Sequence, residues 1–178
     1  ITLDLGASLM DQRPVIDHIK ERLPITVELS VLGLLIAYFV GIPLGILLSV
    51  KQNTPTDRGL TTATFLMWSL PTFWVGMLLI IFFCNKEFFY WFPASGVQSF
   101  NPDPSWNWLD RFFDHAYHMA MPVLTSTYAS FAVISRFMRT SMLENLRLDY
   151  VRTARAKGLS ESLVIYRHVL RNSLIPIV

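Results

Sequence analysis

The side chains most able to do chemistry in this sequence lie between Asp114 and Ser130. His115 and His118, beside Asp114, have a spacing that could place two imidazoles on one helical face, an arrangement that metal ions use. No cysteine lies near them to complete a zinc set, so a pair of interfacial histidines is the preferred interpretation and no metal site is predicted. G-x-S-x-G, H-E-x-x-H and Walker-type glycine motifs do not occur. No catalytic residue and no cofactor is therefore predicted.

Hydroxyl side chains follow these histidines. Ser126 and Ser130 are four positions apart, with Thr127 beside them, which places them on one face of a helix. Such a face can line a polar pathway or hydrogen-bond to a neighbouring helix, and helix contact is the preferred interpretation. Ser126 and Ser130 are kept as candidate pathway residues. An intramembrane enzyme that uses Ser126 and His118 is a further hypothesis, against which the missing nucleophile motif argues.

The elements that carry these residues are long runs without charge. The chain of 178 residues is 52% hydrophobic and only 16% charged, whereas a soluble domain carries about 25% charge. Three uncharged runs are long enough to cross the roughly 30 Å hydrocarbon core of a bilayer as helices: 29–50, 60–84 and 116–135. The sequence therefore predicts an all-α, polytopic transmembrane helical bundle. Residues 1–28 are predicted to be an external segment, and residues 29–178 the transmembrane domain.

Basic residues predict the orientation of the three spans. Ten of the fifteen Lys and Arg fall in segments 51–59 and 136–172, and five fall in 1–28 and 85–115. The positive-inside rule places the first two segments in the cytoplasm. The aromatic-rich segment 85–115 is then outside, where anchoring at the lipid headgroups is preferred to a ligand-stacking platform. Membrane lipid is a predicted partner, and no nucleic acid is.

Small residues and prolines predict how the helices pack and bend. A stripe of small residues repeats every four positions in the first span: Gly33, Ala37, Gly41 and Gly45. Such a stripe lets another helix approach closely. We expect Pro24 to end a short amphipathic helix within 1–28, and Pro43 to bend the first span. Pro71 is expected to kink the second span, as either a moving hinge or a static bend.

Segment 136–172 is too basic to enter lipid. It predicts a first helix from about 141 to 157 that stops at Gly158. A second helix follows, in which Ser160 is the N-cap and Glu161 lies in the first turn, and it runs towards Pro176. We call this helix–glycine–helix segment, 141–176, the elbow. Its apolar residues predict an exposed strip flanked by arginines: Leu146, Tyr150, Val151, Ala154 and Leu159. A docking site for another protein and an interfacial helix on anionic lipid both fit.

The elbow contains D-Y-V-R-T-A-R-A-K-G-L-S at 149–160 and R-H-V-L-R-N-S-L-I-P at 167–176. These stretches resemble the cytoplasmic EAA loop of ABC importer permeases, most closely the oligopeptide/dipeptide/nickel family. E-R-L-P-I-T-V-E-L, G-I-P-L-G, S-L-P-T-F-W-V-G and W-F-P-A-S-G also resemble that family. The general pattern has Glu and Ala where this chain has Arg152 and Thr153, and Ile where it has His168. Those departures are usual in the peptide branch.

The resemblance implies a permease subunit of an ATP-driven importer that moves peptides across the bacterial inner membrane. It implies about six spans in the full protein, of which this chain, interpreted as a fragment, holds the second to the fourth. The implied partners are cytoplasmic ABC ATPase subunits, a second homologous permease subunit, and a periplasmic or lipid-anchored substrate-binding protein. The chain itself would not be an enzyme. Nickel or another small solute is an alternative cargo, and a channel or non-transport membrane scaffold is an alternative of another class. The implied ATPase-coupling residues are Tyr150, Arg152, Thr153, Ala154, Ala156, Lys157 and Gly158.

Overall fold

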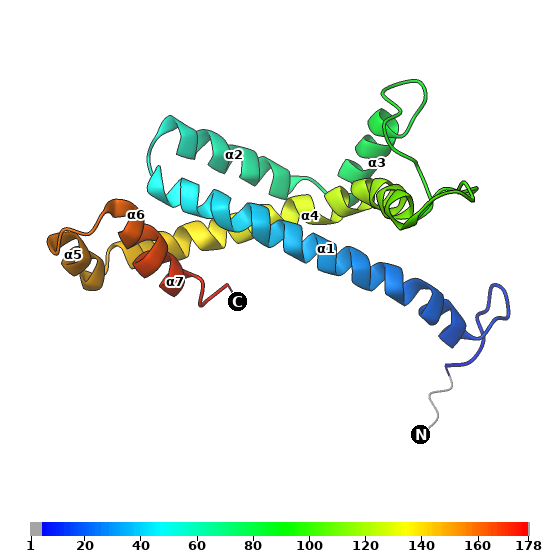
Figure 1. Ribbon diagram of the computed structural model, residues 1–178, viewed down its shortest axis with the longest axis horizontal. Coiled ribbons are helices and arrows are strands. Elements are labelled where there is room, and N and C mark those ends of the chain that lie inside the picture. The colour runs from blue at the N-terminus through cyan, green and yellow to red at the C-terminus, as the bar shows by residue number, and fades with distance from the viewer. Residues whose placement is uncertain (1–4, 178) are drawn as a thin grey trace.

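The computed structural model describes residues 5–177, which fold into helices and no β-strand (Figure 1). The predicted all-α class is confirmed. Two long helices, α1 (Val15–Val50) and α4 (Trp108–Leu146), pack against each other. α2 (Pro55–Ser69) lies beside both, and α3 (Thr72–Phe83) lies against α4. Four short helices then form the elbow: α5 (Asp149–Ala156), α6 (Glu161–Leu163), the π-helix η1 (Val164–Val169) and α7 (Leu170–Ser173).

α1 is a single helix of 36 residues that runs through Pro24 and Pro43. The prediction that Pro24 ends a separate amphipathic helix is therefore wrong, because the residues of that helix are the first turns of α1. Pro24 removes the hydrogen bond to the carbonyl of Lys20. Both residues are exposed, so solvent can satisfy that carbonyl and the helix continues.

α2 and α3 meet at an angle of 97°. A single kinked helix over 60–84 is therefore a wrong prediction, since the chain forms two helices there. Leu70 is extended, as the residue before a proline usually is, and Pro71 is the N-cap of α3, which begins at Thr72. The carbonyl of Leu70 accepts a hydrogen bond of 2.6 Å from the hydroxyl of Tyr128, a buried residue of α4. This contact holds the break against α4.

Among the helices in residues 5–177, α1 alone is long and apolar enough by itself to cross a membrane. α2 and α3 meet the same criterion only as a bent pair. The third predicted span, 116–135, lies within α4, a continuous helix that does not meet it because hydroxyl and histidine side chains lower its mean hydropathy. The second and third spans therefore stay predictions.

The stripe of small residues in α1 faces α4. All four residues of the stripe are buried: Gly33, Ala37, Gly41 and Gly45. A Cβ atom at Gly45 would lie only 2.6 Å from the carbonyl oxygen of Ser135 and 2.5 Å from the Cβ of Met138. A Cβ atom at Gly33 would lie 3.4 Å from the hydroxyl of Thr127, an ordinary contact. The two backbones are therefore closest near the C-terminal end of α1, where only glycine fits.

Candidate functional site

The first arm of the elbow begins later than the sequence predicts. α4 continues to its end, the chain turns at Leu148, and α5 starts only at Asp149. The N–H of Leu148 donates to the carbonyl of Asn145 at 3.1 Å, and the hydroxyl of Tyr150 donates to the side-chain oxygen of Asn145 at 3.0 Å. These bonds hold a corner that contains neither glycine nor proline, so no turn signal marked it in the sequence.

Gly158 ends α5 in the left-handed turn that the sequence predicts. Its φ is +79°. Its N–H donates to the carbonyl of Arg155 at 2.9 Å, and the N–H of Leu159 donates to the carbonyl of Ala154 at 3.4 Å. This pair of bonds is a Schellman motif, which satisfies the last carbonyls of the helix and reverses the chain.

An ion pair closes the turn around Gly158. Arg155 donates from Nε and Nη2 to the two carboxylate oxygens of Glu161 at 3.0 and 2.5 Å. The side chains are 43% and 57% exposed, so the pair contributes at most about 1 kcal/mol. The hydrogen bond from Arg155 lowers the pKa of Glu161 below its usual value. Ser160 occupies the predicted N-cap position, but its side chain makes no capping hydrogen bond, which corrects that prediction.

The second arm of the elbow contains the π-helix η1, which the sequence did not indicate. Its wider turn buries Val164, Ile165 and Val169 together. π-Helical turns are rare and occur frequently at functional sites. Two serine hydroxyls attach the segment after η1 to α4 and to η1. Ser141 of α4 donates to the carbonyl of Ser173 at 3.0 Å, and Ser173 donates to the carbonyl of Val169 at 2.9 Å.

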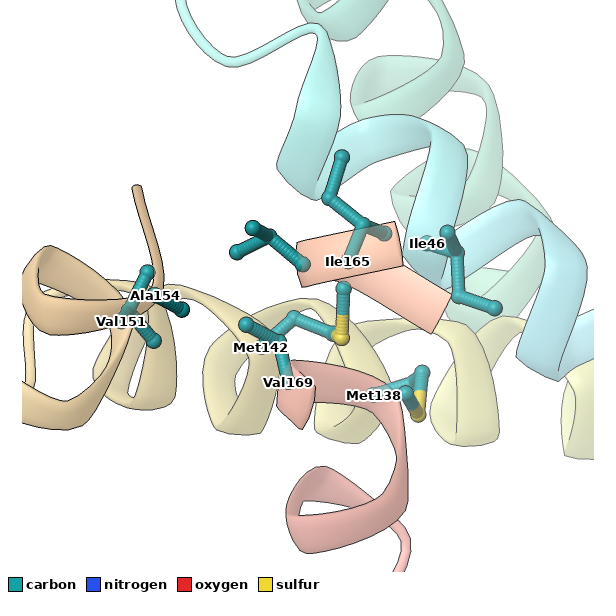
Figure 2. Packing of buried hydrophobic residues seen from close by; sticks show 8 residues of the cluster. Ile46, Met138, Met142, Val151, Ala154, Ile165 and Val169 are labelled. Atoms are coloured by element: carbon teal, nitrogen blue, oxygen red, sulfur yellow. The ribbon is translucent and has the colours of Figure 1, made fainter. Parts of the chain in front are cut away.

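One apolar cluster beneath the elbow joins four elements (Figure 2). Its buried members are Ile46 from α1, Met138 and Met142 from α4, Val151 and Ala154 from α5, and Val164, Ile165 and Val169 from η1. Close-packed protein interiors have low compressibility and transmit strain. The cluster therefore forms a continuous packed connection from α5 through η1 to the adjoining ends of α1 and α4.

The predicted exposed apolar strip of the elbow points inward. Val151 and Ala154 are buried in the cluster, and Leu146, Tyr150 and Leu159 pack against it. The prediction of an exposed apolar docking strip is therefore wrong. Composition showed which residues are apolar, but packing against η1 within the shared cluster decided which face is covered.

The seven residues predicted to couple to an ATPase divide between two faces of α5 and its turn. Ala154 is buried and Tyr150 is half-buried. The other five are exposed: Arg152, Thr153, Ala156, Lys157 and Gly158. Arg152 lies 3.6 Å from Asp149, and both side chains are almost fully open to solvent. The elbow therefore presents a polar, partly basic face on one side and the apolar cluster on the other.

An ion pair, which the sequence did not indicate, ties the buried Asp57 of α2 to the half-buried Arg139 of α4 near the elbow. Arg139 donates from Nε and Nη2 to the two carboxylate oxygens of Asp57 at 3.2 and 2.9 Å. Burial by itself would raise the pKa of Asp57, but hydrogen bonds from Arg139, Asn53 and Thr61 lower it below its usual value. Asp57 is therefore ionised at neutral pH. Its partner lies 82 positions away in the sequence, so no local pattern could reveal the pair.

At the opposite end of α4, His115 fastens the loop between α3 and α4. Its Nε2 lies 2.6 Å from a carboxylate oxygen of Glu28, and its Nδ1 lies 2.7 Å from the carbonyl of Val97. The hydrogen bond with Glu28 raises the pKa of His115 above its usual value. Asp114 accepts two hydrogen bonds from Ser99, which lower the pKa of Asp114. No group of three possible metal ligands occurs among residues 5–177.

The two candidate pathway residues, Ser126 and Ser130, are both exposed on α4. The hydroxyl of Ser126 lies 3.0 Å from the carbonyls of Pro122 and Val123, so it bonds within its own helix. It also lines a cavity between α3 and α4. No hydrogen bond joins Ser126 to His118 within the described residues, so the geometry of a serine–histidine nucleophile is not found there.

The same architecture matches a known protein family. Residues 41–178 match the family described as "Binding-protein-dependent transport system inner membrane component", a range that includes the end of α1, the α2–α3 pair, α4 and the elbow. This chain belongs to that family. The resemblance inferred from the elbow is therefore confirmed, and the protein is an inner membrane protein.

Similarity to individual permeases of this family extends along the whole chain. The peptidoglycan transport system permease protein YejB of Agrobacterium fabrum is 35% identical, over 100% of this chain and 49% of its own length. The oligopeptide transport system permease protein AppB of Bacillus subtilis is 34% identical, over 98% and 53%. The dipeptide transport system permease protein DppB of Escherichia coli K12 is 36% identical, over 98% and 56%.

These relatives are permease subunits of transport systems rather than enzymes. The chain spans about half the length of the curated relatives that it matches. Family membership is therefore established for this part of a permease, which contains the described helices and the elbow.

Proposed function

We propose that this chain is part of a permease subunit of an ATP-driven importer that carries peptides across the bacterial inner membrane. The observation that supports this most is the elbow, whose exposed basic face is linked through one buried cluster to α1 and α4. Peptide is proposed as cargo because relatives are named for the transport of oligopeptides and dipeptides.

In this proposal the elbow faces the cytoplasm and the loop between α3 and α4 faces outside. Cytoplasmic ATPase subunits bind the exposed face of α5, a second homologous permease subunit completes the pathway, and a periplasmic or lipid-anchored binding protein delivers the peptide. Closure of the ATPases displaces α5, and the cluster passes the displacement to α1 and α4. α2 follows α4 through the ion pair of Asp57 and Arg139. The chain performs no covalent chemistry in this cycle.

Charge reversal on the exposed face of α5 tests the proposal. Arg152→Glu combined with Lys157→Glu leaves the buried cluster untouched, since both side chains are exposed. We expect at least about a tenfold loss of ATPase association and of ATP hydrolysis stimulated by the binding protein, because like charges would then face the partner surface. The measurement uses the full permease co-purified with its partner subunits.

Arg111→Glu is the matched control, because Arg111 is equally exposed but lies at the other end of α4. It should leave association and hydrolysis unchanged. Normal stimulated hydrolysis and normal peptide uptake in the double variant would contradict the proposal. A double variant that keeps its ATPases but no longer binds anionic vesicles would favour the lipid-surface alternative for the elbow.

A further inference from the structure

A cavity of about 460 Å³ lies between α3, α4 and the loop that joins them, and the proposed coupling mechanism does not use it. Its volume is within the roughly 300–1,000 Å³ that is usual for small-molecule sites. α3 contributes Gly76 and Ile80 to its wall, the loop contributes Pro93, and α4 contributes Thr125. The wall is therefore mainly apolar, with a few polar groups from α4.

His118 places an unpartnered acceptor in this cavity. Its side chain is only 7% exposed. Its Nδ1 lies 2.8 Å from the carbonyl oxygen of Asp114, and because a carbonyl only accepts, Nδ1 carries the proton. When the ring carries only this proton, Nε2 is an acceptor, and within residues 5–177 no hydrogen bond reaches it; the carboxylate of Asp114 lies 3.5 Å from Nδ1, on the other side of the ring. His118 and Gly96 both line the cavity, and Cδ2, the ring atom bonded to Nε2, lies 3.9 Å from the position of a Cβ at Gly96.

Two hydroxyls of α4 in the same wall also offer only acceptor capacity. Thr125 donates to the carbonyl of Met121 at 2.9 Å, and Ser126 donates to carbonyls of its own helix at 3.0 Å. Each hydroxyl has used its proton, so it can only accept a further hydrogen bond. A ligand that matches these groups must bring hydrogen-bond donors and a mainly apolar body.

We propose that this cavity binds the amino-terminal end of a short peptide, whose ammonium group or first N–H donates to Nε2 of His118. This inference rests on the proposed function, because it names the end of the peptide that the permease recognises. Ile80 and Pro93 supply apolar surface for the first side chain. Ser126, a candidate pathway residue, lies in the same wall.

Cys84 provides a reporter for this site. It is the one cysteine in the sequence, it lines the cavity, and it is 7% exposed. The experiment uses the full permease assembled with its partner subunits in lipid vesicles. The probe is trialanine, and mass spectrometry follows the modification of Cys84 by a small methanethiosulfonate reagent. We expect trialanine to slow this modification in the wild-type complex.

Two substitutions of His118 test whether the protection of Cys84 depends on the acceptor at Nε2 or only on the shape of the site. His118→Asn keeps a group near Nδ1 but removes the acceptor at Nε2, and should raise the trialanine concentration for half-protection by about fivefold. His118→Gln carries an amide oxygen near the position of Nε2 and should restore most of the protection. Thr140→Ala, an exposed position on α4 outside the cavity wall, is the control and should behave like the wild type.

Uptake of trialanine is measured on the same vesicles. Import without any protection of Cys84 would overturn the inference while leaving the proposed function intact. Equal protection in the wild type and in His118→Asn, or a Cys84 that never reacts because the cavity is closed in the full protein, would overturn it too. Protection of Cys84 without import would support the site and contradict the proposed function instead.

Discussion

At the scale of single residues, backbone conformation restricts what position 158 can hold, and charge pairing restricts what position 57 can hold. Gly158 has a φ of +79° with nothing within 4 Å of a Cβ placed there, so its requirement for glycine is conformational rather than steric. Asp57 has a different restriction, because its carboxylate is buried and is matched by the guanidinium of Arg139. Gly158 thus fixes the turn between α5 and α6, and Asp57 fixes α2 against α4.

Gly158→Ala should destabilise the permease by about 1 kcal/mol, because alanine is strained in a left-handed conformation. Gly59→Ala is the matched control: Gly59 also has open space around it but lies within α2. There alanine should stabilise by up to about 1 kcal/mol through its higher helix propensity. Thermal unfolding of the purified full permease measures both shifts, and shifts of the same sign would contradict the conformational explanation.

Asp57→Asn and Arg139→Gln should each destabilise the fold by about 3 kcal/mol, since each leaves the other member of the pair uncompensated. The double variant should lose much less than the sum of the two. An additive double variant in chemical unfolding would show that the pair does not interact.

The pKa of Asp57 also gives the sign of a pH effect. The folded state lowers this pKa below the usual 3.8, so the pair stabilises the fold above that pH and its contribution is lost as the pH falls through the folded value. The stability difference between wild type and Asp57→Asn should therefore be constant from neutral pH down to about pH 5 and shrink only under stronger acid.

At the scale of elements, the α1–α4 pair carries the other parts of the molecule. The small stripe of α1 brings the two backbones together, and the broken pair α2–α3 is attached to α4 by a tyrosine at the break and an ion pair near the elbow. The elbow then rests on the ends of both long helices through the apolar cluster. Loss of the α1–α4 contact would therefore separate α1 from α4 and from the elbow that α4 carries.

Gly45→Ala should destabilise the helix pair by about 2 kcal/mol, because its Cβ would overlap the backbone of Ser135, which cannot move away as a side chain can. Gly33→Ala is the matched control at the looser end of the same stripe, where the contact is of ordinary length. It should cost less than about 0.5 kcal/mol. Equal losses on thermal unfolding would contradict the proposed gradient of helix separation.

At the scale of the whole molecule, the two ends of the α1–α4 pair are chemically different. One end carries the basic elbow, and the other carries the aromatic loop that Glu28 and His115 fasten to α1. The distribution of basic residues predicts that the elbow is cytoplasmic and the loop is external. The proposed import mechanism requires this orientation, because ATP is available on one side only.

Single cysteines in a Cys84→Ser background test the orientation in intact cells. Arg111→Cys and Lys157→Cys both replace exposed residues, at opposite ends of the molecule. A membrane-impermeant maleimide should label Arg111→Cys at once and Lys157→Cys only after the membrane is permeabilised. The reverse pattern would invert the predicted topology and remove the elbow from the ATPase side.

Properties set by neighbours in the sequence were predictable from it. The charge-free runs, the four-residue repeat of small side chains and the glycine turn of the elbow depend on composition and local backbone preference, and the elbow motif sufficed to identify the family. Pro24 shows the limit of such rules, because a proline signal does not reveal whether the carbonyl that it frees can find another partner.

Only the tertiary structure decided properties that depend on residues far apart in the chain. Tyr128 stabilises a 97° break that a proline by itself predicts only as a kink. Packing against η1 within the apolar cluster covers the apolar side of α5, and Asp57 meets Arg139 only because α2 folds back on α4. The sequence predicted a set of membrane-type helices and an elbow that resembles the coupling loop of importer permeases. The fold decided which face of the elbow is open to a partner, because burial is set by what packs against a helix rather than by the helix itself.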